Sequence, residues 1–251
     1  FTGNIGIIGR KESYYGQPTY SPALLGGIEK FTAQNNQHVL FLGNYTHPDL
    51  SAYEKVDGVL TFNVEYQAER LKYLPPNLPR VSLFIKENEA ANVVADDMGG
   101  AKQATEHLIQ LGHRRIACLF EKYLSVSRQR LAGYQEALEE ANIEADPQWM
   151  RLTEVLFAVE NRPTYLEWGY ANMKEWLREG WADLGCSAIL AQNDAAAIGV
   201  MQALQEAGIE VPGQVSVMGF DGTELCNHVT PKLCSMKIPF TEIGYKAAEI
   251  L

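Results

Sequence analysis

Three acidic positions follow short apolar runs in this chain, and their side chains could do chemistry. They are Asp96-Asp97, Asn193-Asp194 and Asp221. Adjacent carboxylates could hold a metal ion or act as general acid and base. The structural alternative is that the first two pairs cap the helices that follow, and that Asp221 begins a turn with its neighbouring glycine. The residues alone leave both interpretations open.

A fourth polar segment, residues 125–130, has the sequence Ser-Val-Ser-Arg-Gln-Arg and lies between an expected strand and an expected helix. Its hydroxyl and guanidinium groups, together with Asp and Asn side chains, suit the neighbouring hydroxyls of a sugar ring. Tyr14, Tyr15, Tyr165 and Trp168 could add stacking faces, although aromatics at helical spacing more often belong to a core. The sequence has no nucleophile elbow, P-loop, zinc-protease or dinucleotide motif. We therefore expect a site for a small polar ligand, with no catalytic set, cofactor or metal.

The elements that must position these residues alternate between short apolar runs and longer helical patterns. Such alternation predicts βαβ units, with parallel sheets covered by helices. Ligands of such sheets bind beyond the carboxyl ends of the strands, so Asp221 is expected just past its strand at the mouth of a site. The elements are too many for one small sheet, and we predict an α/β fold of two doubly wound lobes. The expected strands are residues 5–9, 39–42, 56–62, 80–85, 93–95, 116–120, 188–191 and 215–220, and the expected helices are residues 21–34, 99–111, 128–141, 165–178, 195–207 and 243–251.

The composition is that of a globular protein, with 251 residues of which 46% are hydrophobic and 21% charged. The net charge of −10 argues against nucleic-acid binding by this segment, which would need a concentrated basic face. Four cysteines without a C-x-x-C pair are expected to be thiols of a reducing compartment, buried in the main: Cys118, Cys186, Cys226 and Cys234. No apolar run approaches the roughly 20 residues that span a bilayer, and no signal peptide is evident.

Five motifs follow one another along nearly the whole chain. Residues 111–117 read L-G-H-R-R-I-A, residues 130–138 fit R-x-x-G-[FY]-x-x-A-L, and residues 188–199 fit A-I-x-A-x-N-D-x-x-A-x-G. Residues 208–221 fit G-x-x-V-P-x-x-[IV]-S-V-x-G-[FY]-D, and residues 94–101 fit V-x-D-N-x-x-G-A apart from one Asp in place of Asn. Together they resemble the effector-binding part of bacterial transcriptional regulators of the LacI/GalR family. Any one motif would be weak, but five in the right order form a strong signal.

The resemblance implies two Rossmann-like lobes similar to type I periplasmic binding proteins, with a sugar or related metabolite bound between them. The first lobe would comprise residues 1–111 and 236–251, and the second residues 112–235. The chain departs from the family between residues 43 and 55, where a short loop is expected in place of a whole helix.

The resemblance also implies which residues contact the ligand. Arg130, Asn193 and Asp221 match the family's common contact positions, and Ser127 and Asp97 match them less closely. The full set of expected ligand-binding residues is Arg130, Asn193, Asp221, Ser127, Asp97, Arg10, Tyr15 and Tyr165. His113 is expected to be structural. Asp221→Ala and Arg130→Ala are both expected to abolish effector binding with little loss of stability.

The function implied by the resemblance is the sensor region of a cytoplasmic, sugar-responsive transcriptional regulator that acts as a homodimer. Operator DNA would be bound only through a helix-turn-helix domain that precedes this chain, and no membrane partner is expected. A periplasmic sugar-binding protein that feeds a transporter is the alternative, and an enzyme acting on a sugar or nucleoside is a third possibility. The codons upstream of this segment would distinguish the first two, because one predicts a helix-turn-helix and the other a signal peptide.

Overall fold

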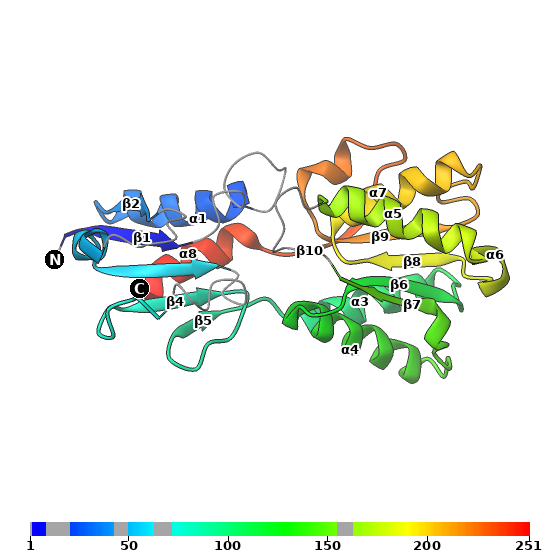
Figure 1. The fold of residues 1–251 in the computed structure, drawn as a ribbon, viewed down its shortest axis with the longest axis horizontal. Coiled ribbons are helices and arrows are strands. Elements are labelled where there is room, and N and C mark those ends of the chain that lie inside the picture. Colours follow the sequence, from blue (N-terminus) through cyan, green and yellow to red (C-terminus); the bar gives the residue numbers. More distant parts are fainter. Residues whose placement is uncertain (1, 9–20, 43–49, 63–71, 155–162) are drawn as a thin grey trace. The chain divides into compact units, whose positions relative to one another are not determined.

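The computed structural model describes residues 2–8, 21–42, 50–62, 72–154 and 163–251 of the chain. The chain forms two compact units, the first made of Phe1–Ala95 with Pro239–Leu251 and the second of Asp96–Ile238. Each unit is built on a five-stranded sheet whose neighbouring strands are all parallel (Figure 1). The predicted α/β fold with two parallel-sheet lobes is confirmed.

The first unit contains β1 (Asn4–Ile8), α1 (Ser21–Gln34), β2 (His38–Phe41), η2 (Leu50–Lys55), β3 (Gly58–Phe62), β4 (Arg80–Leu83), β5 (Ala91–Val93) and α8 (Phe240–Ile250). The sheet order is β2-β1-β3-β4-β5. The β3 strand is buried along its whole length, as expected for a central strand of a covered parallel sheet. The α8 helix returns from the end of the chain to pack against α1, and it also lies against β4 and β5.

Two adjacent glycines in α1 differ in their surroundings, because Gly27 faces α8 and Gly26 does not. A Cβ atom on Gly27 would lie 2.0 Å from the Thr241 carbonyl oxygen, whereas a Cβ atom on Gly26 would meet nothing within 4 Å. Gly27→Ala should therefore lower the free energy of unfolding by about 1–3 kcal/mol or more through overpacking. Gly26→Ala should raise it by about 0.5–1 kcal/mol, because alanine is the better helix former. Urea unfolding measures both effects, and equal stability of the two variants would contradict the close packing.

The stretch between β2 and β3, expected to be only a loop, contains the 3-10 helix η2 at Leu50–Lys55. Residues 43–49 lie outside the described residues. Tyr53 from η2 and Val56 join Ile8 and Val59 in a buried apolar cluster. This short helix therefore contributes to the buried apolar packing beside β1 and β3.

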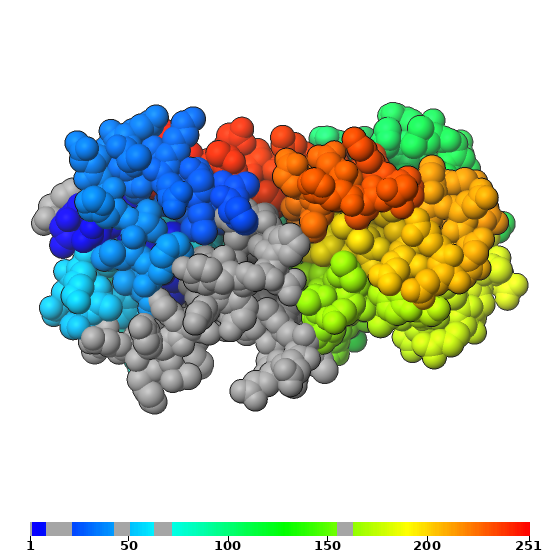
Figure 2. Space-filling view, turned by 90° about the horizontal axis from the view of Figure 1, so that it is seen from above, coloured from blue at the N-terminus to red at the C-terminus, as the bar shows by residue number. Residues whose placement is uncertain are grey.

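The second unit contains α3 (Asp97–Gln110), β6 (Ile116–Glu121), α4 (Ser125–Glu140), η4 (Pro147–Trp149), β7 (Met150–Thr153), α5 (Tyr165–Arg178), α6 (Trp181–Leu184), β8 (Ala188–Ala191), α7 (Asp194–Glu206), β9 (Ser216–Asp221), η5 (Glu224–Asn227) and β10 (Cys234–Lys237). The sheet order is β10-β9-β8-β6-β7. The α3 and α4 helices pack together on one face of this sheet, and α5 and α7 pack together on the other (Figure 1). Figure 2 shows α5 and α7, in yellow-green and yellow, side by side on the surface of this unit.

Alternate residues of β6 enter separate cores on the two faces of the second sheet. Ile116, Cys118 and Phe120 pack with residues of α3 and α4. Ala117 and Leu119 pack with residues of α5 and α7. Because successive side chains of a strand point to opposite faces, both faces are covered and the strand is apolar nearly throughout.

The boundary between the units differs from the one expected from the sequence. The units divide after Ala95 and after Ile238, so α3 belongs to the second unit. The reason is packing, because α3 runs along α4 and also contacts β10. The strands β7 and β10 were not among the expected elements. Both lie at edges of the sheet and have half-buried, mixed sequences (MRLT and CSMK) that give no clear apolar run.

Two simpler expectations concern cysteines and membranes. All four cysteines are free, and Cys118, Cys186 and Cys226 are buried, but Cys234 at the start of β10 is exposed. The expectation of a buried thiol is therefore wrong for Cys234, which lies on an edge strand. None of the helices in the described ranges has the length and apolar character needed to cross a membrane.

Candidate functional site

The candidate site lies at the carboxyl ends of β6, β8 and β9 in the second unit. The α4 helix begins at Ser125, three residues before the start expected from the sequence, so residues 125–130 form its first turns. The Glu121 carboxylate at the end of β6 accepts the N–H groups of Tyr123 and Leu124 just before the helix. This turn brings two of the expected residues, Ser127 and Arg130, onto the inner side of α4, where both are buried.

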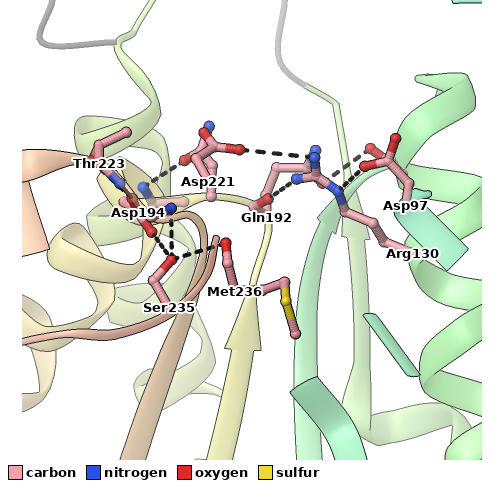
Figure 3. A network of polar contacts seen from close by, with 12 residues as sticks. Asp97, Arg130, Gln192, Asp194, Asp221, Thr223, Ser235 and Met236 are labelled. Carbon is pink, nitrogen blue, oxygen red and sulfur yellow. Dashed lines mark hydrogen bonds and ion pairs between the residues drawn. The ribbon is translucent and has the colours of Figure 1, made fainter. Parts of the chain in front are cut away.

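Arg130 is the centre of the polar network drawn in Figure 3. Its side chain is only 7% exposed, and its Nε donates to Asp97 Oδ1 over 2.8 Å. One terminal nitrogen donates to the Gln192 carbonyl oxygen, and the other lies 3.9 Å from Asp221 Oδ1. The guanidinium plane lies over Phe220, with its carbon 3.8 Å from the ring centroid. Arg130 is thus a buried, multiply bonded cation and not a solvated helix residue.

A close approach of α3 and α4 places Arg130 beside Asp97. A Cβ atom on Gly133 would lie 2.0 Å from the Met98 carbonyl oxygen, so only glycine lets the two helices meet at this point. Met98 directly follows Asp97, and Gly133 lies about one turn after Arg130. The glycine in the R-x-x-G motif therefore has a packing role that brings the charged pair together.

The two neighbouring acids at the start of α3 have separate roles. Asp96 caps the helix, since its carboxylate accepts the Gly99 N–H over 2.9 Å. The capping interpretation is confirmed for this residue. Asp97 is buried on the first turn and pairs with Arg130. Burial raises the pKa of Asp97, while the adjacent Arg130 lowers it and the neighbouring Asp96 raises it further.

Asp221 is the last residue of β9, whereas the sequence predicted that it would lie just past the strand. Its φ is +114°. Its side chain is 13% exposed. Burial raises the pKa of Asp221 to about 8, since the opposing effect of Arg130 is partly offset by Asp194 and Asp97. Burial therefore favours the protonated carboxyl group, which can both donate and accept a hydrogen bond.

Asn193 and Ser127 have partners within the protein. The Asn193 side chain caps α7 and accepts the Ala196 N–H over 2.9 Å. The Ser127 hydroxyl donates to Gln192 Oε1 over 3.0 Å, and the same oxygen accepts the Glu121 N–H over 3.2 Å. Gln192 thus joins α4 to the ends of β6 and β8. Sequence reasoning missed its role, although its position between a strand and the Asn-Asp pair was a usable signal.

The aromatic candidates divide into described and undescribed residues. Tyr165 begins α5 and meets Trp168 edge-on, with ring centroids 5.9 Å apart. Trp168 itself is buried in the core, so it is not a stacking face. Arg10, Tyr14 and Tyr15 lie outside the described residues.

His113 lies at the other end of the sheet. Its Nδ1 is 2.8 Å from the Ser187 hydroxyl and its Nε2 is 3.1 Å from the Ser216 hydroxyl. Ser187 precedes β8 and Ser216 begins β9, so both contacts are at the amino ends of the strands. Burial lowers the pKa of His113, which favours the neutral ring between the two hydroxyls. This arrangement fits the structural role expected for it.

Asp194 was named only as half of a pair, yet it has the larger number of polar contacts of the two. It is 1% exposed and accepts hydrogen bonds from Thr223 and Ser235, which lie after β9 and on β10 (Figure 3). Neither partner was expected from the sequence, because their segments carry no motif. Throughout the described ranges, no three His, Cys, Asp or Glu side chains are arranged to hold a metal ion.

Known proteins with similar sequences include transcriptional regulators. Residues 105–251 match the family model of the periplasmic binding protein-like domain. The HTH-type transcriptional repressor PurR of Vibrio campbellii (strain ATCC BAA-1116) is 29% identical over 218 residues, which cover 80% of this chain and 58% of that protein. The ribose operon repressor of Haemophilus influenzae (strain ATCC 51907 / DSM 11121 / KW20 / Rd) is 28% identical over 240 residues, which cover 91% of this chain and 68% of that protein. The chain thus spans little more than half the length of the first of these relatives.

Solved structures share the fold over the whole chain. A regulatory protein of the LacI family from Chloroflexus aggregans superposes with a TM-score of 0.80 and 26% identity, covering 100% of this chain and 90% of that one. A LacI family transcriptional regulator from Enterococcus faecium with bound ribose gives a TM-score of 0.77 and 24% identity, covering 98% and 88%. At that identity the second comparison shows the fold alone.

Proposed function

The chain belongs to the LacI/GalR family through its periplasmic binding protein-like domain, and we propose that it is the effector-binding region of a sugar-responsive bacterial transcriptional regulator. The observation that carries this proposal is the arrangement of Arg130 between Asp97 and Asp221 at the carboxyl ends of the strands. Planar carboxyl and guanidinium groups held by the protein suit the paired hydroxyls of a sugar. The relative named as a ribose operon repressor supports a sugar in particular.

The residue roles follow from which atoms the protein leaves for a ligand. Asp221 would bind hydroxyls through a carboxyl group that both donates and accepts, and Arg130 would donate from the nitrogen that faces Asp221. Asn193 would offer its amide nitrogen, because its oxygen caps α7. Ser127 and Asp97 would hold Arg130 and the strand ends in place. Tyr165, at the start of α5, would supply an aromatic face.

The charge of the site favours an uncharged ligand over a phosphorylated one. Four acidic side chains, Glu121, Asp97, Asp194 and Asp221, lie at this edge, and the first three are buried. Arg130, a buried cation among them, is already bonded to Asp97 and the Gln192 carbonyl. A phosphate dianion would have to displace these bonds and approach a set of buried acidic side chains, which is unfavourable.

A thermal-shift screen of this chain tests the proposal. Free ribose, galactose and cellobiose are compared with ribose 5-phosphate and galactose 1-phosphate. A ligand that binds only the folded state stabilises it by about 2.7 kcal/mol at a hundredfold excess over its Kd. We expect at least one free sugar to raise the Tm and the matched phosphate to leave it unchanged. A larger shift with a phosphate would contradict the charge argument, and a flat response to a full set of sugars would contradict the sugar assignment.

The partners and location of the full protein are part of the same proposal. Because relatives named as HTH-type regulators extend beyond the matched region, operator DNA would be bound by a part of the protein outside this chain. The whole protein would be a cytoplasmic homodimer that binds its effector without transforming it, in keeping with relatives that are named as regulators. Sugar binding would shift the balance between two conformations and thereby change the affinity for DNA.

A further inference from the structure

The backbone at the end of β9 adopts an unfavourable conformation at Asp221. Its φ of +114° is followed by a φ of +68° at Gly222. A residue with a side chain in this region is uncommon and strains the backbone. Such a conformation persists only where neighbouring groups hold it, and it turns the Asp221 side chain at the point where the strand ends.

Two hydrogen bonds from β10 and its continuation hold the two residues of this turn. The Ile238 N–H donates to the Asp221 carbonyl oxygen over 3.0 Å. The Gly222 N–H donates to the Ser235 hydroxyl oxygen over 3.0 Å. The hydroxyl of Ser235 is therefore the side-chain contact that fixes the residue directly after Asp221.

The Ser235 hydroxyl is itself held by a buried carboxylate on α7. Ser235 donates to Asp194 Oδ1, while Asp194 Oδ2 accepts the Thr223 N–H over 2.7 Å and the Thr223 hydroxyl over 2.8 Å. Figure 3 shows Asp194 between these two partners, with Asp221 beside them on the side of Arg130. One carboxylate thus joins the start of α7, the segment after the turn and β10.

The sequence of β9 leaves room for this carboxylate. A Cβ atom on Gly219 would lie 2.5 Å from Asp194 Oδ1, so any larger residue would displace it. The position of Asp194 on the first turn of α7 also favours a negative charge there. Asp194 accepts three hydrogen bonds through its two carboxyl oxygens, which suits a group that must hold a strained turn.

We propose that Asp194 is the positioning residue of the ligand site: through Ser235 and Thr223 it fixes the turn that aims Asp221 at the ligand. Asp194 does not touch the ligand. The inference rests on the proposed function in assigning Asp221 to ligand binding. It adds residues that act on binding without contacting the ligand, because removal of the Asp194 carboxylate should loosen the turn and weaken binding.

Amide hydrogen exchange tests the positioning without any ligand. In Asp194→Asn, the Gly222 and Thr223 amides should exchange at least tenfold faster than in the wild type. Exchange within the later turns of α7 should stay unchanged, because Asn193 still caps the helix. Asp146→Asn is the matched control, since Asp146 accepts the Gln148 N–H at the start of η4 and has no contact with the turn. Unchanged protection at Gly222 and Thr223, or an equal loss in the control, would overturn the proposal.

Sugar affinity supplies the second measurement. Titration with ribose and with cellobiose should show at least a tenfold weaker Kd in Asp194→Asn and in Ser235→Ala. Ser235→Thr, which keeps the hydroxyl, should restore most of the affinity. The effects of Asp194→Asn and Asp221→Ala should be far from additive, since both act through Asp221.

The two measurements separate failure of the positioning from failure of the sugar assignment. Faster exchange with unchanged sugar affinity would overturn the positioning role. A wild type that binds neither sugar would count against the proposed function, and the exchange rates would then decide the positioning by themselves. If Asp194→Asn does not fold, Ser235→Ala carries both measurements, because it removes the Gly222 contact and leaves the bonds between Asp194 and Thr223.

Discussion

Arg130→Met should lower the free energy of unfolding by about 3–5 kcal/mol at neutral pH and abolish sugar binding. The reason is that Asp97, whose side chain is 4% exposed, would remain buried without its partner. The Gln192 carbonyl would lose its donor, and the Phe220 ring would lose the guanidinium plane that covers it. Urea unfolding at pH 7 measures the first effect, and sugar titration measures the second. The small stability effect expected from the sequence does not fit a side chain with these contacts.

Two further variants show whether the charge pair is the cause. Arg128→Met removes an exposed arginine two residues away, and it should change the stability by less than about 0.5 kcal/mol. Asp97→Leu combined with Arg130→Met removes both charges, so it should recover most of the lost stability but none of the binding. If the double variant is as unstable as Arg130→Met, the loss comes from packing and not from an unpaired acid. Burial raises the pKa of Asp97, so the deficit in Arg130→Met should shrink as the pH falls toward about 4 and should be smallest below that pH, where the carboxyl is protonated in folded and unfolded chains alike.

The fold was predictable from the sequence wherever a strand or helix has a strong period. The α1 and α5 helices have the expected bounds, and β6, β8 and β9 end within one residue of the expected position. The failures occur where the period is weak. The β7 and β10 strands lie at sheet edges, where one side of the strand is open and polar residues are tolerated. The α4 helix begins three residues earlier than expected, and tertiary packing buries both Ser127 and Arg130 on its first turns.

The site was predictable only as a set of candidate positions. Periodicity places Asp97, Asn193 and Asp221 at strand ends, but it leaves open which acid caps a helix and which is free. The structure assigns capping to Asp96 and Asn193 by single hydrogen bonds to Gly99 and Ala196. Burial then distinguishes Asp97 and Asp194, which are buried, from Asp221, which is partly exposed. Burial depends on helices that are distant in sequence, so a local pattern does not reveal it. Thr223 and Ser235 could not be found from local patterns, because their importance comes only from the position of the Asp194 carboxylate.

Asp221→Asn should make the protein more stable at alkaline pH while it weakens sugar binding by at least tenfold. The folded-state pKa of Asp221 is raised from its ordinary 3.8 to about 8, mainly by burial. The folded chain therefore keeps a proton that the unfolded chain releases near pH 4, and stability falls as pH rises from about 4 to 8. Asparagine has no proton to lose and tolerates positive φ, so the variant should not show this fall. The gain should be absent at pH 4 and reach at most about 6 kcal/mol above pH 8.

Chemical unfolding at pH 4, 7 and 9 measures the effect, with Asp146→Asn as the control. Asp146 caps η4, and asparagine caps a helix as well as aspartate does, so that variant should stay within about 0.5 kcal/mol of the wild type at every pH. A stability difference that does not grow with pH would mean that Asp221 is ionised and well solvated in the folded chain. We expect the Asp221→Asn variant to be more stable and to bind sugar more weakly. This combination is typical of a residue that serves ligand binding and lowers the stability of the fold. It would also explain why hydrogen bonds from Ile238 and Ser235 hold the turn around Asp221. The protein must fix both a strained backbone and a carboxyl group whose ionised form is disfavoured by burial.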